Sequence, residues 1–477
     1  MLERIFGIII CKVFLILDNF PANFIMIKHS PNKSQRHLFL PNLIEFINPR
    51  HPLYLLADKI DWHSFETDFA RFYSKEGAPA KPIRLMVGIL ILKQLYNLAD
   101  ETVIEEWVSN PYFQYFCGQT MFQWKFPCDP SDLVHFRHRI GVEGVEKVLG
   151  ASLFIHGEDA LNEDVSIDTT VQEKNITFPT ETKLAIKIIK NCAQIAEKEE
   201  VKQRQSYKFV SQDLLKVANS KSKEKESERK KARRKIKTIA GRVVRELERK
   251  LSEKGMERNL GELEKYDKVL NQKKNDKNKI YSLHESGVSC IAKGKAHKKY
   301  EFGSKVSFAV GQKSNLIKAA VSFKGNPNDN QTLEKTLEQQ ERITGVRPER
   351  AYTDRGYKSR QIKETEIVTP SNGVGKTASE KTKLRKSFRR RAGIEPIIGH
   401  VKSDFGMERN YLKEEIGDEI NAILAASAFN FKSWMRKAVG KLIFVLNYLK
   451  WSWRMWTLKR FTGDWRVNNY NPTHRLP

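Results

Sequence analysis

The chain has 477 residues, with 84 Lys and Arg against 57 Asp and Glu, for a formal net charge of +27. Its 40% hydrophobic and 10% aromatic content excludes a wholly disordered protein, and its length suits two or three domains. Five cysteines exclude a disulfide scaffold and suit a reducing cytoplasm. The charge favours nucleic acid as partner over a basic protein without one, because cations that neutralise phosphates release condensed counterions.

The first residues are apolar but do not predict a membrane segment. The stretch from Ile5 to Leu17 is interrupted by Lys12 and is shorter than the roughly 20 apolar residues that a membrane span requires. No convincing signal-peptide cleavage site follows it. We therefore predict no membrane association. We interpret residues 1–36 as an N-terminal extension and Met26 as the natural start.

Residues 37–160 have the pattern of an all-α domain. Arg84 to Leu92 is apolar on all sides, which is typical of a buried helix. Asp100 precedes an amphipathic segment and is expected to cap its helix. Pro130 begins another helix, with basic edges. These features suit DNA binding or self-association, and their spacing does not distinguish the two.

From residue 161 the pattern changes to strands mixed with helices. Val165 to Thr170 alternates as a strand does, and a helix is expected from Glu181 to Ala196. Further expected elements are a strand hairpin over Lys305–Val310 and Leu316–Phe323, a helix over Thr332–Ile343, strands over Arg350–Asp354 and Glu366–Thr369, a basic helix over Lys381–Phe405 and an apolar helix over Ile416–Met435. Residues 161–436 are therefore predicted to form an α/β domain with a mixed sheet and flanking helices.

A basic helical insertion is predicted at residues 196–280. Between Lys221 and Lys250 there are 14 Lys or Arg and 5 acidic residues. An apolar stripe at helical spacing nevertheless runs through this stretch, so one face should be packed. The stripe consists of Ile236, Ile239, Ala240, Val243, Val244, Leu247 and Leu251. A solvated helix without a ligand is the alternative to a DNA-binding one.

Residues 437–477 are predicted to form a C-terminal tail. Four tryptophans stand among its lysines and arginines, a mixture that would allow stacking on bases. A read-through tail or a helix packed on the core is the alternative that we favour.

Three acidic residues suggest a catalytic site. Asp168 and Asp354 are expected at strand ends, where ligands gather in open α/β sheets. In the predicted basic helix, one face would carry Phe388, Arg391, Glu395 and Lys402. Two Asp and one Glu suit Mg²⁺, and two such ions would support in-line phosphoryl transfer. The alternative is that each acid is an ordinary loop or ion-pair residue.

Three segments resemble the acidic motifs of bacterial insertion-sequence DDE transposases, in particular the insertion-sequence-five family. They are Ile167–Thr170, Tyr352–Tyr357 and Arg391–Lys402. Phe388 stands where that family has Tyr, so a hydroxyl contact there is lost. The segment His297–Lys305 also resembles the family text before its second strand, and the resemblance covers roughly residues 37–436.

The resemblance implies a ribonuclease-H-like catalytic fold that cleaves transposon ends and joins the 3′-hydroxyl to target DNA. Asp168, Asp354 and Glu395 would be the catalytic and metal-binding triad, holding two Mg²⁺ or Mn²⁺ ions. Double-stranded DNA, as terminal inverted repeats and target, and further copies of the chain would be its partners. The expected DNA contacts are Arg391, Lys402, His400, Lys383, Arg385, Arg389 and Arg390.

Two other functions stay open from the sequence. One is a ribonuclease-H-like nuclease that cuts without joining, and the other is a decayed transposase copy that only binds DNA. The sequence contains no Walker phosphate-binding loop, so ATP use is not expected. The Cys and His spacing in residues 117–138 fits no standard zinc finger.

One further acid is ambiguous. Asp329 follows a predicted strand and would be either a fourth acid near the metals or part of a turn that caps the next helix. We favour the turn or cap.

Overall fold

A computed structural model describes residues 42–73, 80–220, 224–273, 275–292, 299–357, 361–370 and 377–461, and at 159 and 441–461 it describes the backbone alone. The predicted extension over residues 1–36 and the end of the predicted tail lie outside the described residues.

The N-terminal helical unit is built of helices over its described residues, with an isolated β-bridge between Asn42 and Met121. The helices are α2 (Leu43–Phe46), α3 (Pro52–Lys59), α4 (Trp62–Ala70), α5 (Ile83–Leu95), α6 (Asp100–Ser109), α7 (Pro111–Phe116) and α8 (Pro130–Phe154). As its apolar sequence predicts, α5 is buried from Leu85 to Leu92. The expected cap at Asp100 is wrong, because its carboxylate pairs with Lys93 and Arg137 instead.

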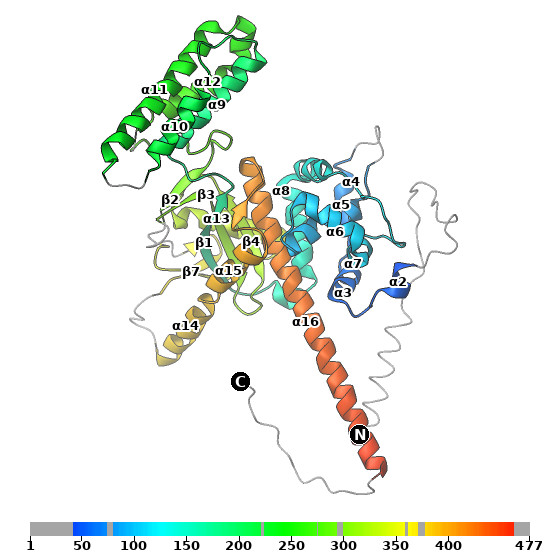
Figure 1. Ribbon diagram of the computed structural model, residues 1–477. Helices are drawn as coiled ribbons and strands as arrows, with labels where there is room; N and C mark the ends of the chain where they lie inside the picture. The colour runs from blue at the N-terminus through cyan, green and yellow to red at the C-terminus, as the bar shows by residue number, and fades with distance from the viewer. Residues whose placement is uncertain are drawn as a thin grey trace.

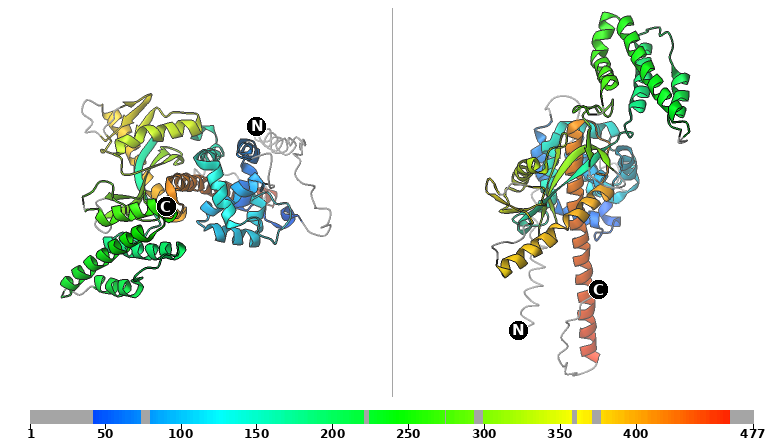
Figure 2. Two further views of the ribbon diagram at one scale, coloured as in Figure 1. Left: turned by 90° about the horizontal axis from the view of Figure 1, so that it is seen from above. Right: turned by 90° about the vertical axis from the view of Figure 1, so that its left-hand side faces the viewer.

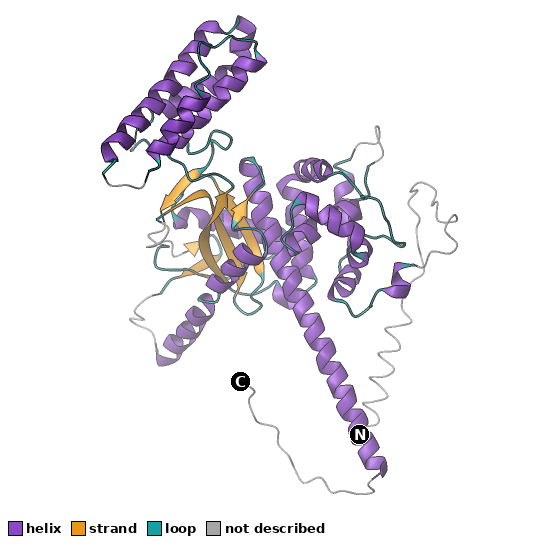
Figure 3. Cartoon of the chain, in the orientation of Figure 1, coloured by secondary structure: helices purple, strands orange, loops and turns teal. Residues whose placement is uncertain are grey.

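The strands gather into one mixed sheet beside this unit (Figure 3). They are β1 (Val165–Lys174), β2 (Ser289–Ala292), β3 (Tyr300–Gly311), β4 (Ile317–Phe323), β5 (Arg350–Tyr352), β6 (Gln361–Ile362), β7 (Thr365–Val368) and β8 (Arg409–Asn410). Their order is β2-β3-β1-β5-β7-β6, with β4 paired to β3 and β8 to β1. The predicted mixed α/β sheet and the β3–β4 hairpin are confirmed, since β1 is antiparallel to β3 and parallel to β5.

Helices cover both faces of this sheet. They are α13 (Asp329–Thr344) on one face, and α15 (Ile394–Asp404) and α16 (Glu414–Phe461) on the other. Leu333 and Leu337 of α13 pack against Ile167 of β1, whereas Phe308 of β3 faces the α15 side. Because successive strand residues point to opposite faces, Asp168 faces the α15 side, in line with Phe308, its partner across the strands.

A separate helical unit stands away from the sheet (Figure 1). It contains α9 (Glu181–Lys198), α10 (Lys208–Ala218), α11 (Glu226–Lys250) and α12 (Glu253–Asn271). The predicted stripe of α11 is buried from Ile236 to Leu247, and Ile188 of α9 joins the same core. The packed unit therefore begins at α9, ahead of the predicted boundary at residue 196. The cations of α11 lie mostly on its exposed face.

The predicted continuous helix over Lys381–Phe405 is wrong, because the chain forms two helices. The first, α14, spans Ala378–Arg391, and α15 begins after a turn at Ala392 and Gly393. Pro396 explains the break: it has no N–H to donate, and its ring would clash with the carbonyl of Ala392 in a continuous helix. Phe388 packs the end of α14 against the sheet. Its ring makes an edge contact with the Tyr352 ring, and the two ring centroids lie 5.8 Å apart.

Helix α16 joins the sheet to the N-terminal helical unit. It packs on β4 and on α3, α5 and α8, and then runs on beyond them (Figure 1, Figure 2). The predicted helix over Ile416–Met435 therefore exists and is longer than expected. Of the described helices, none combines the length and apolar character needed to cross a membrane.

Asn430 of α16 makes the polar part of this joint. Its fully buried amide accepts from the Ile317 N–H and donates to the Ile317 carbonyl, both at 2.9 Å, and donates to Ser152 Oγ at 3.1 Å. One side chain thus pairs the backbone of β4 and reaches α8.

Replacing Asn430 by Leu should lower the free energy of unfolding by about 2–4 kcal/mol, because it leaves buried backbone groups of Ile317 unpaired. Denaturant unfolding measures this loss. The control Arg436→Leu changes an exposed residue of the same helix and should cost under about 0.5 kcal/mol. Equal stability of the two variants would contradict the role of Asn430.

His156, at the end of α8, makes stability depend on pH. Its Nε2 lies 3.1 Å from the Asn430 carbonyl oxygen, and burial is the largest cause that lowers its pKa from 6.5 to about 4. Between these values the folded protein binds fewer protons than the unfolded chain, so stability falls as the pH falls from 6.5 towards 4.

His156→Gln should remove about 1–2 kcal/mol of this loss in the free energy of unfolding at acid pH. The expected effect is smaller than the full pKa shift implies, because the ring is partly exposed. Denaturant unfolding at pH 7 and pH 4.5 gives the comparison. The exposed His400→Gln variant is the control. A pH dependence unchanged by His156→Gln would refute the assignment.

Candidate active site

Two predicted acids lie level on neighbouring parallel strands. The register of β1 and β5 places Ser166 opposite Tyr352. Two residues further along each chain, it brings Asp168 beside Asp354, just after β5 ends. The expectation that Asp168 ends its strand is wrong, because β1 continues to Lys174 and is paired with β3 as far as Glu173.

Arg391, at the end of α14, and Glu395, at the start of α15, lie on the same side of the sheet as Asp168. Arg391 Nη2 lies 3.3 Å from Asp168 Oδ2. The pKa of Asp168 is raised, chiefly by burial, and the charges of Asp354 and Glu395 add to this. Arg391 and the Thr169 N–H oppose the shift. The structure therefore brings the three predicted acids and the predicted arginine into one electrostatic neighbourhood.

The turn after β5 holds Asp354 in place. Its Oδ1 accepts a hydrogen bond from the Gly356 N–H at 2.8 Å. A Cβ at Gly356 would lie only 3.1 Å from that oxygen, so a side chain there would crowd the carboxylate by a few tenths of an ångström. Tyr357 follows this turn and is buried, with 3% of the residue exposed. Its pKa is raised mainly by burial and then by the charges of Asp329, Asp168 and Asp354.

Asp329 reaches the site from the opposite face of β1. It is the first residue of α13, and its Oδ1 accepts from Thr169 Oγ1 at 2.8 Å and pairs with Lys305 Nζ at 2.6 Å. The helix cap belongs to Asn328, whose N–H bonds the side chain of Gln331 at 3.1 Å. The Asn-Asp pair gave a local signal for a helix start, but no local pattern identified Thr169 and Lys305 as partners of the aspartate.

The acidic site has the donor chemistry of a divalent-cation site. Carboxylate oxygens are the ligands that Mg²⁺ and Mn²⁺ prefer. In this arrangement the Arg391 guanidinium faces Asp168, and Glu395 is exposed. Over the described ranges, no three His, Cys, Asp or Glu side chains form a group that could hold an ion, and this includes the Cys and His of the N-terminal helical unit.

The predicted DNA-binding cations occupy three different places. Arg391 joins the acidic site. The exposed residues Lys383, Arg385, Arg389 and Arg390 line α14, which is described along its whole length and buries none of its side chains. We call α14 the basic arm, since it projects from the sheet (Figure 1).

The remaining two lie further along α15. His400 Nδ1 is 2.9 Å from Asp404 Oδ2, and both side chains are about half exposed. Lys402 lies in the wall of a cleft that adjoins the N-terminal helical unit. The partner of His400 is thus Asp404 on its own helix rather than one of the three acids.

Comparison with known proteins gives two family matches in this chain. A transposase domain, DUF772, matches residues 41–139, and a transposase DDE domain matches residues 272–431. The second match includes Asp354 and Glu395, and Asp168 lies between the two matched segments. No solved structure matches the chain.

One curated relative is an uncharacterized protein, ORF8 in the nfe locus of Rhizobium meliloti. It is 41% identical over 186 residues, which cover 37% of this chain and 88% of that protein. The chain therefore belongs to the insertion-sequence DDE transposases.

Proposed function

We propose that this transposase cleaves the ends of its mobile element and joins the 3′-hydroxyl to target DNA at Asp168, Asp354 and Glu395. One observation carries the proposal: Asp168 of β1 lies beside Asp354, just past the end of the parallel strand β5, and the charge of Glu395 acts on Asp168. DDE transposases use divalent metal ions. The donor set of this site matches that requirement.

The sheet supports a ribonuclease-H-like catalytic domain. In space the central strands run β4-β3-β1-β5-β7, antiparallel on the β3 side of β1 and parallel on the β5 side. This order sets the end of β5 beside the first half of β1, where Asp168 lies. It also leaves one face of β1 open to the helix that carries Glu395.

The three carboxylates would hold two Mg²⁺ or Mn²⁺ ions, which when bound activate an attacking oxygen and stabilise the leaving one. The chain's own residues orient the strand. Arg391, with 15% of its side chain exposed, offsets the charge of Asp168 and would hold a backbone phosphate beside it. The turn at Gly356 fixes the Asp354 carboxylate for the same strand.

Basic surfaces around the site would bind the rest of the DNA. We assign the terminal inverted repeats and the target to the basic arm and to the exposed cations of α11. Residues 37–160 would add contacts to the element ends and between copies in a homo-oligomer. Membership of the insertion-sequence-five family, independence of ATP and location at the bacterial nucleoid belong to the same proposal.

Asp354→Asn tests the site directly. It should reduce metal-dependent strand cleavage at least about a hundredfold, because one carboxylate of the centre is replaced by a neutral amide. DNA affinity should stay nearly unchanged, since cations elsewhere carry it. The measurement is cleavage and strand transfer on paired element ends, with gel-shift binding in parallel.

Asp404→Asn is the matched control, because it neutralises an exposed aspartate on α15 outside the acidic site. Cleavage retained by Asp354→Asn would refute the assignment. Cutting without strand-transfer products would favour the nuclease, and salt-dependent binding of the parent without cutting would identify a decayed copy.

Asp329→Asn tests whether the fourth acid supports the centre. We expect cleavage to fall about tenfold and stability by about 1–3 kcal/mol, because Thr169 loses a charged acceptor and the buried Lys305 loses its counterion. The exposed Asp213→Asn variant is the control. Wild-type cleavage rates in a folded Asp329→Asn protein would show that this aspartate has no role in the centre.

A further inference from the structure

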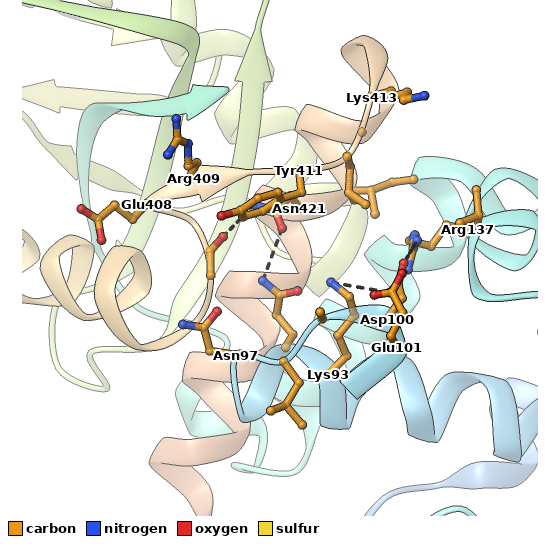
Figure 4. A pocket seen from close by; sticks show the side chains of 18 of the residues that line it. Lys93, Asn97, Asp100, Glu101, Arg137, Glu408, Arg409, Tyr411, Lys413 and Asn421 are labelled. Carbon is orange, nitrogen blue, oxygen red and sulfur yellow. Dashed lines mark hydrogen bonds and ion pairs between the residues drawn. The ribbon is translucent and has the colours of Figure 1, made fainter. Parts of the chain in front are cut away.

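A cleft of 780 Å³ separates the N-terminal helical unit from the catalytic sheet (Figure 4). One wall is formed by the end of α5, the start of α6 and part of α8. The other is formed by the end of α15, β8 and the start of α16. The cleft is distinct from the acidic site, and the proposed chemistry does not use it.

The wall formed by α5, α6 and α8 holds two cations that share one carboxylate. Arg137 Nη1 and Nη2 donate to the two oxygens of Asp100 at 2.9 and 2.6 Å, and Lys93 Nζ lies 3.7 Å from Asp100 Oδ1 (Figure 4). Their side chains are only 5–17% exposed. Two positive charges thus face one negative charge, and one positive charge of this cation cluster is not balanced within the cluster. An unbalanced charge is costly there because burial removes water from it. An anion that enters the cleft would balance it.

The rest of the lining is also more basic than acidic. Its acids besides Asp100 are Glu101 and Glu408, both exposed. Its further cationic or titratable side chains are His138, Lys402, Arg409 and Lys413. The cations are spread along both walls. A polyanion therefore fits the cleft better than a neutral ligand or an anion of a single charge does.

Tyr411 adds an aromatic surface to the cleft. It is 71% exposed, on the wall opposite the Lys93–Asp100 pair (Figure 4). An exposed tyrosine among cations is the combination that binds single-stranded nucleic acid, since a base stacks on the ring while cations hold the backbone.

The position of the cleft connects it to the acidic site. Lys402 lies on its wall, two turns along α15 from Glu395, or about 10 Å. A strand whose scissile phosphate lies at the acids would reach the cleft within a few nucleotides.

We propose that this cleft binds the DNA strand next to the cleavage position, with a backbone phosphate on the cation cluster of Lys93, Asp100 and Arg137 and a base stacked on Tyr411. The proposal rests on the proposed function and deepens it, because it assigns the flanking strand a place between the two parts of the protein.

Two variants in the cleavage-deficient Asp354→Asn background test it. Lys93→Met leaves Arg137 and Asp100 as a balanced pair, so the fold should survive. Tyr411→Ala removes an exposed side chain. Lys147→Met is the matched control, since it also removes one positive charge paired with an aspartate, Asp68 at 3.0 Å, but lies outside the cleft lining.

The probes are a synthetic duplex and the same duplex with a single-stranded extension of about six nucleotides. Lys93→Met and Tyr411→Ala should each weaken binding of the extended duplex about tenfold and leave the blunt duplex within about twofold. Lys93→Met should also reduce the salt slope for the extended duplex by about one. Lys147→Met should not distinguish the two probes.

Equal binding of both probes by all variants would overturn the proposal and leave the cation cluster as a structural ion pair. If Lys93→Met does not fold, as thermal denaturation would reveal, Tyr411→Ala decides the question alone. The binding comparison needs no cleavage. A parent enzyme that cuts no DNA would therefore contradict the proposed function, whereas binding of DNA in the cleft would still be decided by the two probes.

Discussion

The pairing of β1 on both of its edges is the constraint on which the site depends. Its apolar residues, such as Ile167, are fully buried beneath α13, so a slip of one residue would turn them to the α15 face and bury Asp168 in their place. The antiparallel ladder to β3 fixes that register over nine residue pairs. The short parallel contact with β5 can then bring Asp354 beside Asp168 although few residues form it.

An acidic centre in so basic a protein needs its charges kept apart. Asp168 is partly buried and faces Arg391, whereas most of the other cations whose burial the structure describes lie on exposed surfaces. The basic arm carries its cations away from the sheet, and α11 presents its own on a unit with a separate core. This division suits a protein that grips phosphates over a wide area and acts on one of them.

Helix α16 makes the two parts of the protein a single framework. Its residues from Ile420 to Met435 pack between the sheet and the N-terminal helical unit, and Asn430 links β4 to α8 through hydrogen bonds at 2.9–3.1 Å. The cleft with the cation cluster has one wall from each part. The start of α16 itself forms part of one of these walls.

The sequence by itself determined the buried helix α5, the packed stripe of α11, the β3–β4 hairpin and, by resemblance, the family. Local periodicity suffices for these because it reports which side of a segment is buried. It did not determine the length of β1 or the break before Glu395, although Pro396 signals it. The contacts of Asp329 with Lys305 and of Lys93 with Asp100 were also decided only by the tertiary structure. Side chains far apart in the chain meet through strand register and helix packing, which no local pattern encodes.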